Sequence, residues 1–350
     1  MDGEVEVGAD RGATVLWPSR AESIPRVSVV IPTYNRALRL ERLLRALHQC
    51  TMPPGGMEVI VVDDGSSDST AAVAADADVT YLAQTNAGPA AAREVGWRSA
   101  RGEIVVFLDD DVVPELDAVE RLVSALDEAD GVGAAILCLD ETSLIANYMH
   151  VDGLVNHKVT EGTVLWLITA AAAFRRDALE RVGGFDLDFP RAAGEDVDLS
   201  LRLLEAGCVL RLEPTALVRH DHHSSFAQLM GTCHRYGTAY TLLAARHVAH
   251  RRDRKRSALL RLSPTEWVRV FMGYRRVASV PRSLAFVGLH AFVGLPYALG
   301  ILAGARAAAT TSPRFTDLQI VGRAQAAAAV DAEPAAADQQ VGREHAAPAA

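Results

Sequence analysis

The stretch "VSVVIPTYNRALRLERLLRAL" (residues 27–47) indicates how the folded part of the chain begins. Its first five residues are mostly β-branched, and the run stops at Pro32, as a buried strand does before a turn. The i, i+3, i+4, i+7 spacing of an amphipathic helix then follows, with Leu40, Leu43, Leu44 and Leu47. The stretch therefore predicts a strand, a turn and a helix.

The same pattern recurs farther along the chain. Further apolar strands are predicted at "EVIVVDD" (58–64), "DVTYLA" (78–83) and "EIVVFL" (103–108), each followed by a helical pattern. Strands that are apolar throughout and alternate with amphipathic helices indicate a mostly parallel central sheet with helices on both faces. The sequence therefore predicts an α/β fold.

Polar clusters stand where three of these strands end: "TYN" (33–35), "DDGSSD" (63–68) and "DDD" (109–111). Ligands bind at the carboxyl ends of strands in such sheets, so we expect one crevice to collect the clusters. Asp109 and Asp111 are two residues apart, and on an extended segment they project to the same side, where carboxylate oxygens suit Mg²⁺ or Mn²⁺. The alternative is a solvated helix N-terminus, where Asp is also favoured.

The amino-acid composition limits the kinds of binding partner and the cellular compartment that we expect for this protein. The formal net charge of -9 gives the protein no general attraction to nucleic acid. The four cysteines form no CxxC pair, which suits a reducing cytosol and argues against a disulfide framework or a thiolate zinc site. Because "MDGEVEVGAD" lacks the pattern of a secretory signal, we expect the catalytic part to stay in the cytoplasm.

The two ends and one apolar stretch differ from the rest. Residues 1–25 and the Ala-rich residues 307–350 are predicted to be disordered. Residues 283–305 contain no Asp, Glu, Lys or Arg, and at ~20 residues per span they could cross a bilayer. Glycines and Pro296 interrupt them, so the alternative is a pair of short interfacial or core helices. Basic residues at 251–256 favour peripheral or single-span contact with the inner face of the cell membrane.

From residue 27 to about residue 237 the chain resembles a family 2 glycosyltransferase of the GT-A fold. The motifs that carry the resemblance are "VSVVIPTYNR", "VIVVDDGSSDST", "NAGPAAAREVGWRSARGEIVVFLDDD", "FRRDALERVGGFD" and "GEDVDL", in that order. The resemblance implies a catalytic domain over 26–240, with a nucleotide-binding half (26–139) and an acceptor half (140–240), followed by a helical segment (241–306). It also implies hexosyl or deoxyhexosyl transfer, with inversion, from a UDP-, dTDP- or GDP-linked donor to a glycan, lipid-linked or small-molecule acceptor.

The resemblance also implies which residues bind the donor. The backbone around Pro32, Thr33 and Tyr34 would cradle the base and ribose, and Asp63 or Asp64 would accept hydrogen bonds from them. Alternatively, Asp64 only caps its turn. Arg93 would face the nucleotide pocket, although Glu94 follows it where the family typically has Asn.

By the same resemblance, Asp109 and Asp111 hold a divalent metal that bridges the two donor phosphates, and Asp110 points away or supports the site as a substrate-binding residue. His220 completes metal or diphosphate binding, with His222 as second choice. An independent zinc site is disfavoured, because "HDHHSSF" (220–226) offers no i, i+4 His pair and no CxxC.

The motif "GEDVDL" supplies two acidic residues at the start of a predicted helix. By resemblance Asp196 is the base that deprotonates the acceptor hydroxyl, and Glu195 binds acceptor or donor hydroxyls. The alternative is that both are ordinary acidic residues of a first helical turn. The apolar face of this helix, with Val197, Leu201 and Leu204, is expected to be buried against the sheet.

One departure from the family concerns the substrate. The segment "TAAAAF" (169–174) has alanines where the family usually has Gly and polar residues, so an atypical donor or acceptor subsite is expected. Trp166, just upstream, could stack on a sugar ring or belong to the core.

Two other functions fit the sequence less well. A sugar-phosphate nucleotidyltransferase of the same fold would need a Gly-rich loop with a lysine after the first strand, which "PTYNRALRL" does not provide. A non-catalytic nucleotide-sugar or carbohydrate-binding protein is disfavoured by the joint presence of Asp109, Asp111, Asp196 and His220.

Overall fold

The computed structural model describes residues 24–160, 163–189, 191–247, 264–307 and 320–322. Most of both predicted tails, and the basic residues at 251–256, lie outside these ranges. Residues 320–322 form a strand, β11 (Ile320–Gly322), which pairs with the main sheet.

One large sheet organises the described residues. Its strand order is β11-β3-β2-β1-β4-β9-β6-β10-β5. The strands are β1 (Val27–Thr33), β2 (Met57–Asp63), β3 (Thr80–Gln84), β4 (Ile104–Leu108), β5 (Val112–Pro114), β6 (Gly131–Cys138), β9 (Ala171–Arg175) and β10 (Leu210–His220). Neighbours within β3-β2-β1-β4 run parallel, while β9 runs antiparallel to β4 and β6. The predicted α/β class is therefore confirmed, and a parallel block places the ends of β1, β2 and β4 side by side.

Helices cover both faces of the sheet. Successive side chains of β1 point to opposite sides, and because they are apolar on both sides, each face has to be buried. Val29 and Ile31 join one core with Leu40 and Leu43, whereas Val30 joins the other core. The first face carries α1 (Ala37–Gln49), α2 (Thr70–Ala75) and α4 (Ala118–Ala125); the second carries α3 (Pro89–Ser99), α6 (Arg176–Val182) and α7 (Glu195–Glu205). The predicted strand, turn and helix over residues 27–47 are thus confirmed.

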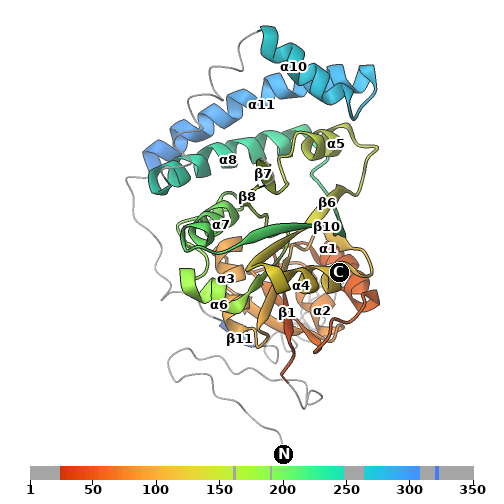
Figure 1. The fold of residues 1–350 in the computed structure, drawn as a ribbon, viewed down its shortest axis with the longest axis vertical. Helices are drawn as coiled ribbons and strands as arrows, with labels where there is room; N and C mark the ends of the chain where they lie inside the picture. Colours follow the sequence, from red (N-terminus) through yellow and green to blue (C-terminus); the bar gives the residue numbers. More distant parts are fainter. Residues whose placement is uncertain (1–23, 161–162, 190, 248–263, 308–319, 323–350) are drawn as a thin grey trace, which may run out of the picture.

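A second helical layer lies beyond the sheet domain (Figure 1). It contains α5 (Leu144–Val151), α8 (Phe226–Arg246), α10 (Pro264–Arg275) and α11 (Val280–Ala307), which share a core around Tyr148 and Phe286. Glycines let α8 and α11 touch closely: a Cβ on Gly300 would lie 2.0 Å from the carbonyl oxygen of His234. Helix α11 is therefore packed along α8 as part of the folded protein.

The apolar stretch predicted at 283–305 falls within α11. The alternative of two short helices is wrong, because the helix runs unbroken from Val280 to Ala307 with Pro296 inside it. In the described ranges, α11 is the one helix whose length and composition would allow it to cross a membrane, over Val280–Ala305 at a mean hydropathy of 1.8.

Candidate active site

Hydrogen bonds join the three polar clusters. The Thr33 hydroxyl donates to Asp110 Oδ2 at 2.9 Å, and the Asp64 amide donates to the Thr33 carbonyl oxygen at 2.9 Å. Asn35, whose φ of 52° lies in the left-handed region that Asn tolerates, accepts a hydrogen bond from the Ser67 amide at 2.7 Å. The three strand ends therefore meet as expected, but the expectation that one crevice collects all three clusters is borne out only for the third, because residues 33–35 and 63–68 do not line the cavity described next.

A cavity of about 460 Å³ opens beside the acidic run. The sheet contributes Asp109, Asp111 and His220, α3 contributes Arg93, α7 contributes Glu195 and Asp196, and Trp166 ends β8 (Thr163–Trp166), which pairs with β7 (Lys158–Thr160). Helix α8 covers the cavity with residues that include Arg235 and Tyr236. The cavity thus brings together seven of the predicted site residues.

The other predicted site residues lie outside the lining of this cavity: Pro32, Thr33, Tyr34, Asp63, Asp64 and Asp110. Tyr34 is 47 % exposed, so its ring is open to a ligand, whereas the other five are buried. A role for the first-strand segment in holding the nucleotide stays a prediction.

Both carboxylates of the second cluster are already engaged. Asp63 accepts hydrogen bonds from the Ser66 amide at 2.8 Å and the Tyr81 hydroxyl at 2.6 Å. Asp64 accepts from the Gln84 side chain and from the Ala87 and Gly88 amides, at 2.7 to 2.8 Å. Asp64 therefore braces the loop between β3 and α3, and nucleotide contact by either residue stays a prediction.

Arg36, the N-cap residue of α1, and Arg39 in the first turn of α1 hold the acidic run. Arg36 Nη1 donates to Asp110 Oδ1 and to Asp111 Oδ2, both at 2.9 Å, and Arg39 Nη1 donates to Asp111 Oδ2 at 3.1 Å. Sequence reasoning missed both arginines; their signal is the one-turn spacing directly after "TYN", which puts them on one helix face at the strand end.

These neighbours set the protonation of two carboxyls. Burial raises the pKa of Asp110 to about 6, despite the Arg36 charge and with help from Asp111. Burial also acts on Asp111, but His220, Arg36 and Arg39 more than offset it, so its pKa lies below the ordinary value. Asp111 is therefore the carboxylate of this pair that ionises first as the pH rises.

A divalent cation fits the donor atoms that face the cavity. Asp111 Oδ1 is buried and has no hydrogen-bond partner among the described residues, and His220 Nε2 lies 3.4 Å from it. Asp109 also lines this cavity and provides a second carboxylate. Oxygen ligands with one imidazole suit Mn²⁺ or Mg²⁺. In the described chain no three acidic, His or Cys side chains are already converged as a metal site, so the carboxylates would have to turn toward the ion.

The histidine cluster separates into different environments. His220 lines the cavity, and its ring stacks on His222 with centroids 4.4 Å apart. Burial, and next the neighbouring His220, lower the pKa of His222 to about 3, so that ring is neutral. Since His222 is not part of the lining, the geometry favours His220, the first of the two candidates.

Arg93 connects the acidic run with α7. Its Nη1 donates to Glu195 Oε1 at 2.9 Å and its Nη2 to Asp109 Oδ1 at 2.6 Å, and the residue is only 4 % exposed. Glu94 points away from the cavity, because it accepts hydrogen bonds from Trp97 Nε1 and the Phe185 amide. Arg93 is thus a buried bridge between two predicted functional carboxylates, and Glu94 belongs to the core.

Asp196 is a half-buried carboxyl on the cavity wall. Burial raises its pKa to about 7, and the nearby Glu195 charge adds to the shift, while Arg93 opposes it. A carboxyl with a pKa near neutrality that faces a cavity has the properties of a general base. The prediction that Val197, Leu201 and Leu204 form the buried face of α7 was wrong in part, because the leucines that α7 buries are Leu199 and Leu203.

The alanine segment lies mainly inside the sheet. Ala172 sits opposite Phe107 of β4 and Gly133 of β6, where a small side chain fits between packed strands. Thr169 and Ala170 line the cavity, but the three alanines that follow do not. The alanines therefore shape the core more than the predicted subsite, whereas Trp166 does line the cavity and can contact a ligand.

Comparison with known proteins shows which family the chain is similar to. Residues 28–183 match the profile described as glycosyl transferase family 2. The pre-mycofactocin glycosyltransferase of Mycobacterium tuberculosis is 37 % identical over 251 residues, which cover 67 % of this chain and 51 % of the relative. Validoxylamine A glucosyltransferase of Streptomyces hygroscopicus is 27 % identical over 261 residues, or 63 % of this chain and 58 % of the relative. The chain thus spans about half the length of these curated relatives.

A solved structure of a mannosyltransferase from Pyrobaculum calidifontis, in complex with GDP-Man and Mn²⁺, also matches. It is 22 % identical, with a TM-score of 0.49, and the match covers 90 % of this chain and 81 % of that one.

Proposed function

The chain carries a domain of glycosyl transferase family 2 over residues 28–183, and from that premise we propose that it transfers a sugar, with inversion, from a nucleoside diphosphate to an acceptor hydroxyl. The observation that carries the proposal is Asp196, a carboxyl with a pKa of about 7 in the same cavity as Asp109 and Asp111. One cavity thus offers a base for the acceptor and an acidic site for the donor.

The reaction follows from this placement. Asp196 takes the proton of the acceptor hydroxyl while the hydroxyl oxygen forms a bond to the anomeric carbon of the donor sugar. At the same time the bond between the anomeric carbon and the diphosphate oxygen breaks, and its electron pair leaves with the diphosphate. Mg²⁺ or Mn²⁺ held by Asp109, Asp111 and His220 would supply charge neutralisation for the leaving diphosphate. Arg93 keeps Asp109 and Glu195 in fixed positions on the two sides of the site.

The α1 arginines give the diphosphate a second source of positive charge. Arg36 lines the cavity and its side chain is 38 % exposed, so its guanidinium can turn from Asp111 toward a phosphate. Burying a second anion beside Asp109 and Asp111 would be unfavourable without such cations. These cations are compatible with the diphosphate of the donor that we propose, a UDP-, GDP- or dTDP-linked sugar, and we propose a small molecule, a glycan or a lipid-linked sugar as the acceptor.

A turnover screen tests the proposal. Purified protein with Mn²⁺ is incubated with UDP-, GDP- and dTDP-sugars, and release of nucleoside diphosphate is measured with and without a pool of candidate acceptors. We expect release from donors with one of the three nucleotides, increased by an acceptor. Saturable donor binding without any release would instead support the non-catalytic binding protein.

We also propose that the helical layer rests on an anionic membrane surface. An exposed apolar face on α10 and α11 includes Met272, Leu284, Phe292, Leu295, Leu299 and Leu302. Arg276 and Arg282 are exposed nearby, and arginines beside an apolar helix face favour anionic lipid headgroups. Because α11 packs along α8, which covers the cavity, a peripheral orientation suits the fold better than a span.

Replacing Leu295, Leu299 and Leu302 with Ser is expected to abolish co-sedimentation with phosphatidylglycerol vesicles, because the apolar face is lost. Turnover on a soluble acceptor should be unchanged. The matched control replaces Leu38 and Leu116, which are 82 % and 60 % exposed on the sheet domain. Equal vesicle binding by all three proteins would contradict the proposed surface.

A further inference from the structure

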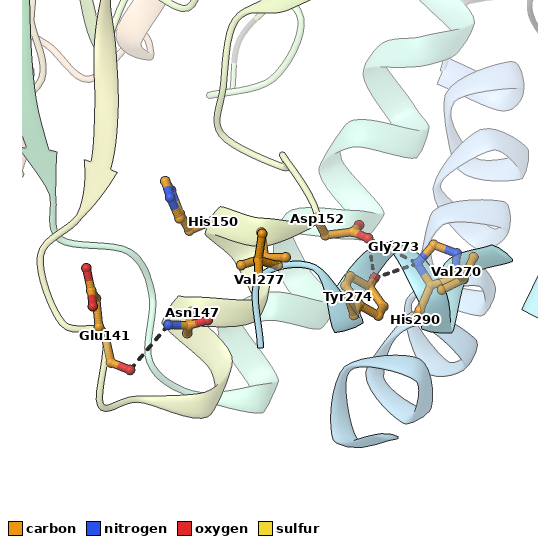
Figure 2. Close-up of a pocket in the computed structure, with 10 residues that line it drawn as sticks. Glu141, Asn147, His150, Asp152, Val270, Gly273, Tyr274, Val277 and His290 are labelled. Atoms are coloured by element: carbon orange, nitrogen blue, oxygen red, sulfur yellow. Dashed lines mark hydrogen bonds and ion pairs between the residues drawn. The ribbon is translucent and has the colours of Figure 1, made fainter. Parts of the chain in front are cut away.

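A second cavity, of about 660 Å³, lies among α5, α10 and α11 (Figure 2). Its polar lining consists of Glu141, Asn147, His150, Asp152, Tyr274 and His290. Helix α5 stands between this cavity and the catalytic one, since Met149 lines the catalytic cavity and its neighbour His150 lines the second. The two cavities are therefore separate but only one helix apart.

Three elements build the inner wall of the second cavity. Tyr274 Oη donates to Asp152 Oδ1 at 2.6 Å, and His290 Nδ1 lies 3.1 Å from the same oxygen. Figure 2 shows these three side chains meeting between the end of α5, α10 and α11. Burial and the Asp152 charge raise the pKa of Tyr274, so its hydroxyl stays protonated as a donor. The inner wall thus carries a carboxylate, a phenol and an imidazole in one hydrogen-bonded group.

The charge of the lining selects the ligand. Among the described residues, the lining includes the carboxylates of Glu141 and Asp152 and contains no Lys or Arg, so it disfavours phosphates and nucleotides. The carboxylates, the Asn147 amide and the His290 imidazole of this lining are suitable hydrogen-bonding partners for the hydroxyl groups of a ligand.

The second cavity also supplies apolar surface. Val151, Val270 and Val277 complete the wall and can contact the C–H groups of a sugar ring. We infer that this cavity binds a neutral sugar unit, and that, if the proposed function holds, the sugar is a distal unit of an acceptor glycan whose end reaches the catalytic cavity.

A glycan array tests the site without catalysis. Labelled full-length protein is applied in EDTA and without donor, to an array of neutral, amino and acidic oligosaccharides, and the affinity for the best neutral ligand is then measured by titration calorimetry. Tyr274→Phe removes one hydroxyl from the wall, and the affinity is expected to fall about tenfold, the loss typical of one unsatisfied buried hydrogen bond. Val277→Trp, at a residue 65 % exposed, fills the cavity without removing any hydrogen bond and should abolish binding.

Leu38→Ser is the matched control, because Leu38 is 82 % exposed and lines neither cavity, so this substitution should leave the affinity unchanged. Failure to bind any neutral oligosaccharide, preference for acidic ones, or loss of binding in Leu38→Ser but not in Val277→Trp would overturn the inference. Release of nucleoside diphosphate in the turnover screen would meanwhile be unaffected, so the two proposals fail separately.

Discussion

Asp196→Asn is expected to lower the turnover number by about 10²- to 10⁴-fold, the usual contribution of a general base. The amide cannot accept the acceptor proton, but it has almost the same shape, so donor affinity should remain unchanged. Measuring initial rates and donor affinity on the same preparation separates the two effects. A variant with full turnover would contradict the assignment of the base.

The raised pKa of Asp196 predicts how the reaction rate and the stability depend on pH. A base with a pKa of about 7 makes the wild-type rate rise with pH up to about 7 and then level off, and this limb should vanish in the variant. Because the folded carboxyl binds a proton that the unfolded chain has released above about pH 4, this group lowers stability as pH rises from about 4 to 7. At pH 8 the Asn variant should therefore be at least as stable as the wild type, which excludes misfolding as the cause of its inactivity.

Arg93→Lys is expected to reduce the free energy of unfolding by about 3–5 kcal/mol, the range for breaking a buried ion pair. One ammonium cannot reach both Glu195 and Asp109, which the two guanidinium nitrogens bridge at 2.9 and 2.6 Å. Either Glu195, whose side chain is 5 % exposed, or Asp109, whose side chain is 26 % exposed, would lose its partner, and the loss is largest if it is Glu195. Denaturant unfolding followed by circular dichroism measures the loss, and the donor KM should rise because Asp109 is no longer held.

Arg98→Lys is the matched control on the same helix. Arg98 pairs with Glu94 four residues earlier, and its side chain is 44 % exposed. Partly exposed pairs of this kind contribute about 1 kcal/mol or less. If the two substitutions reduce the free energy of unfolding by the same amount, Arg93 is not the buried bridge between the acidic run and α7.

The sequence predicted what depends on local pattern. Val29, Ile31, Leu40 and Leu43 occur at strand and helix periods, and those periods alone decide which faces are buried. The meeting of the Thr33, Asp64 and Asp110 clusters also followed from pattern, since parallel strands end at one edge of a sheet.

Features set by neighbours distant in sequence were missed. The Arg36 contact with Asp111 spans 75 positions, and no periodicity reports it. The continuity of α11 through Pro296 depends on packing against α8, which offsets the local preference to break. Likewise Ala172 is small because Phe107 and Gly133 flank it in the sheet, not because a ligand needs room.

We propose above all that Asp111 and its neighbours bind a nucleotide sugar together with a divalent cation. Thermal unfolding of the wild type and Asp111→Ala, with UDP-, GDP- and dTDP-sugars in Mn²⁺ or in EDTA, tests this binding. We expect a rise in Tm with donors of one nucleotide, present in Mn²⁺, lost in EDTA and absent in the variant. An equal rise in EDTA, or in Asp111→Ala, would contradict it.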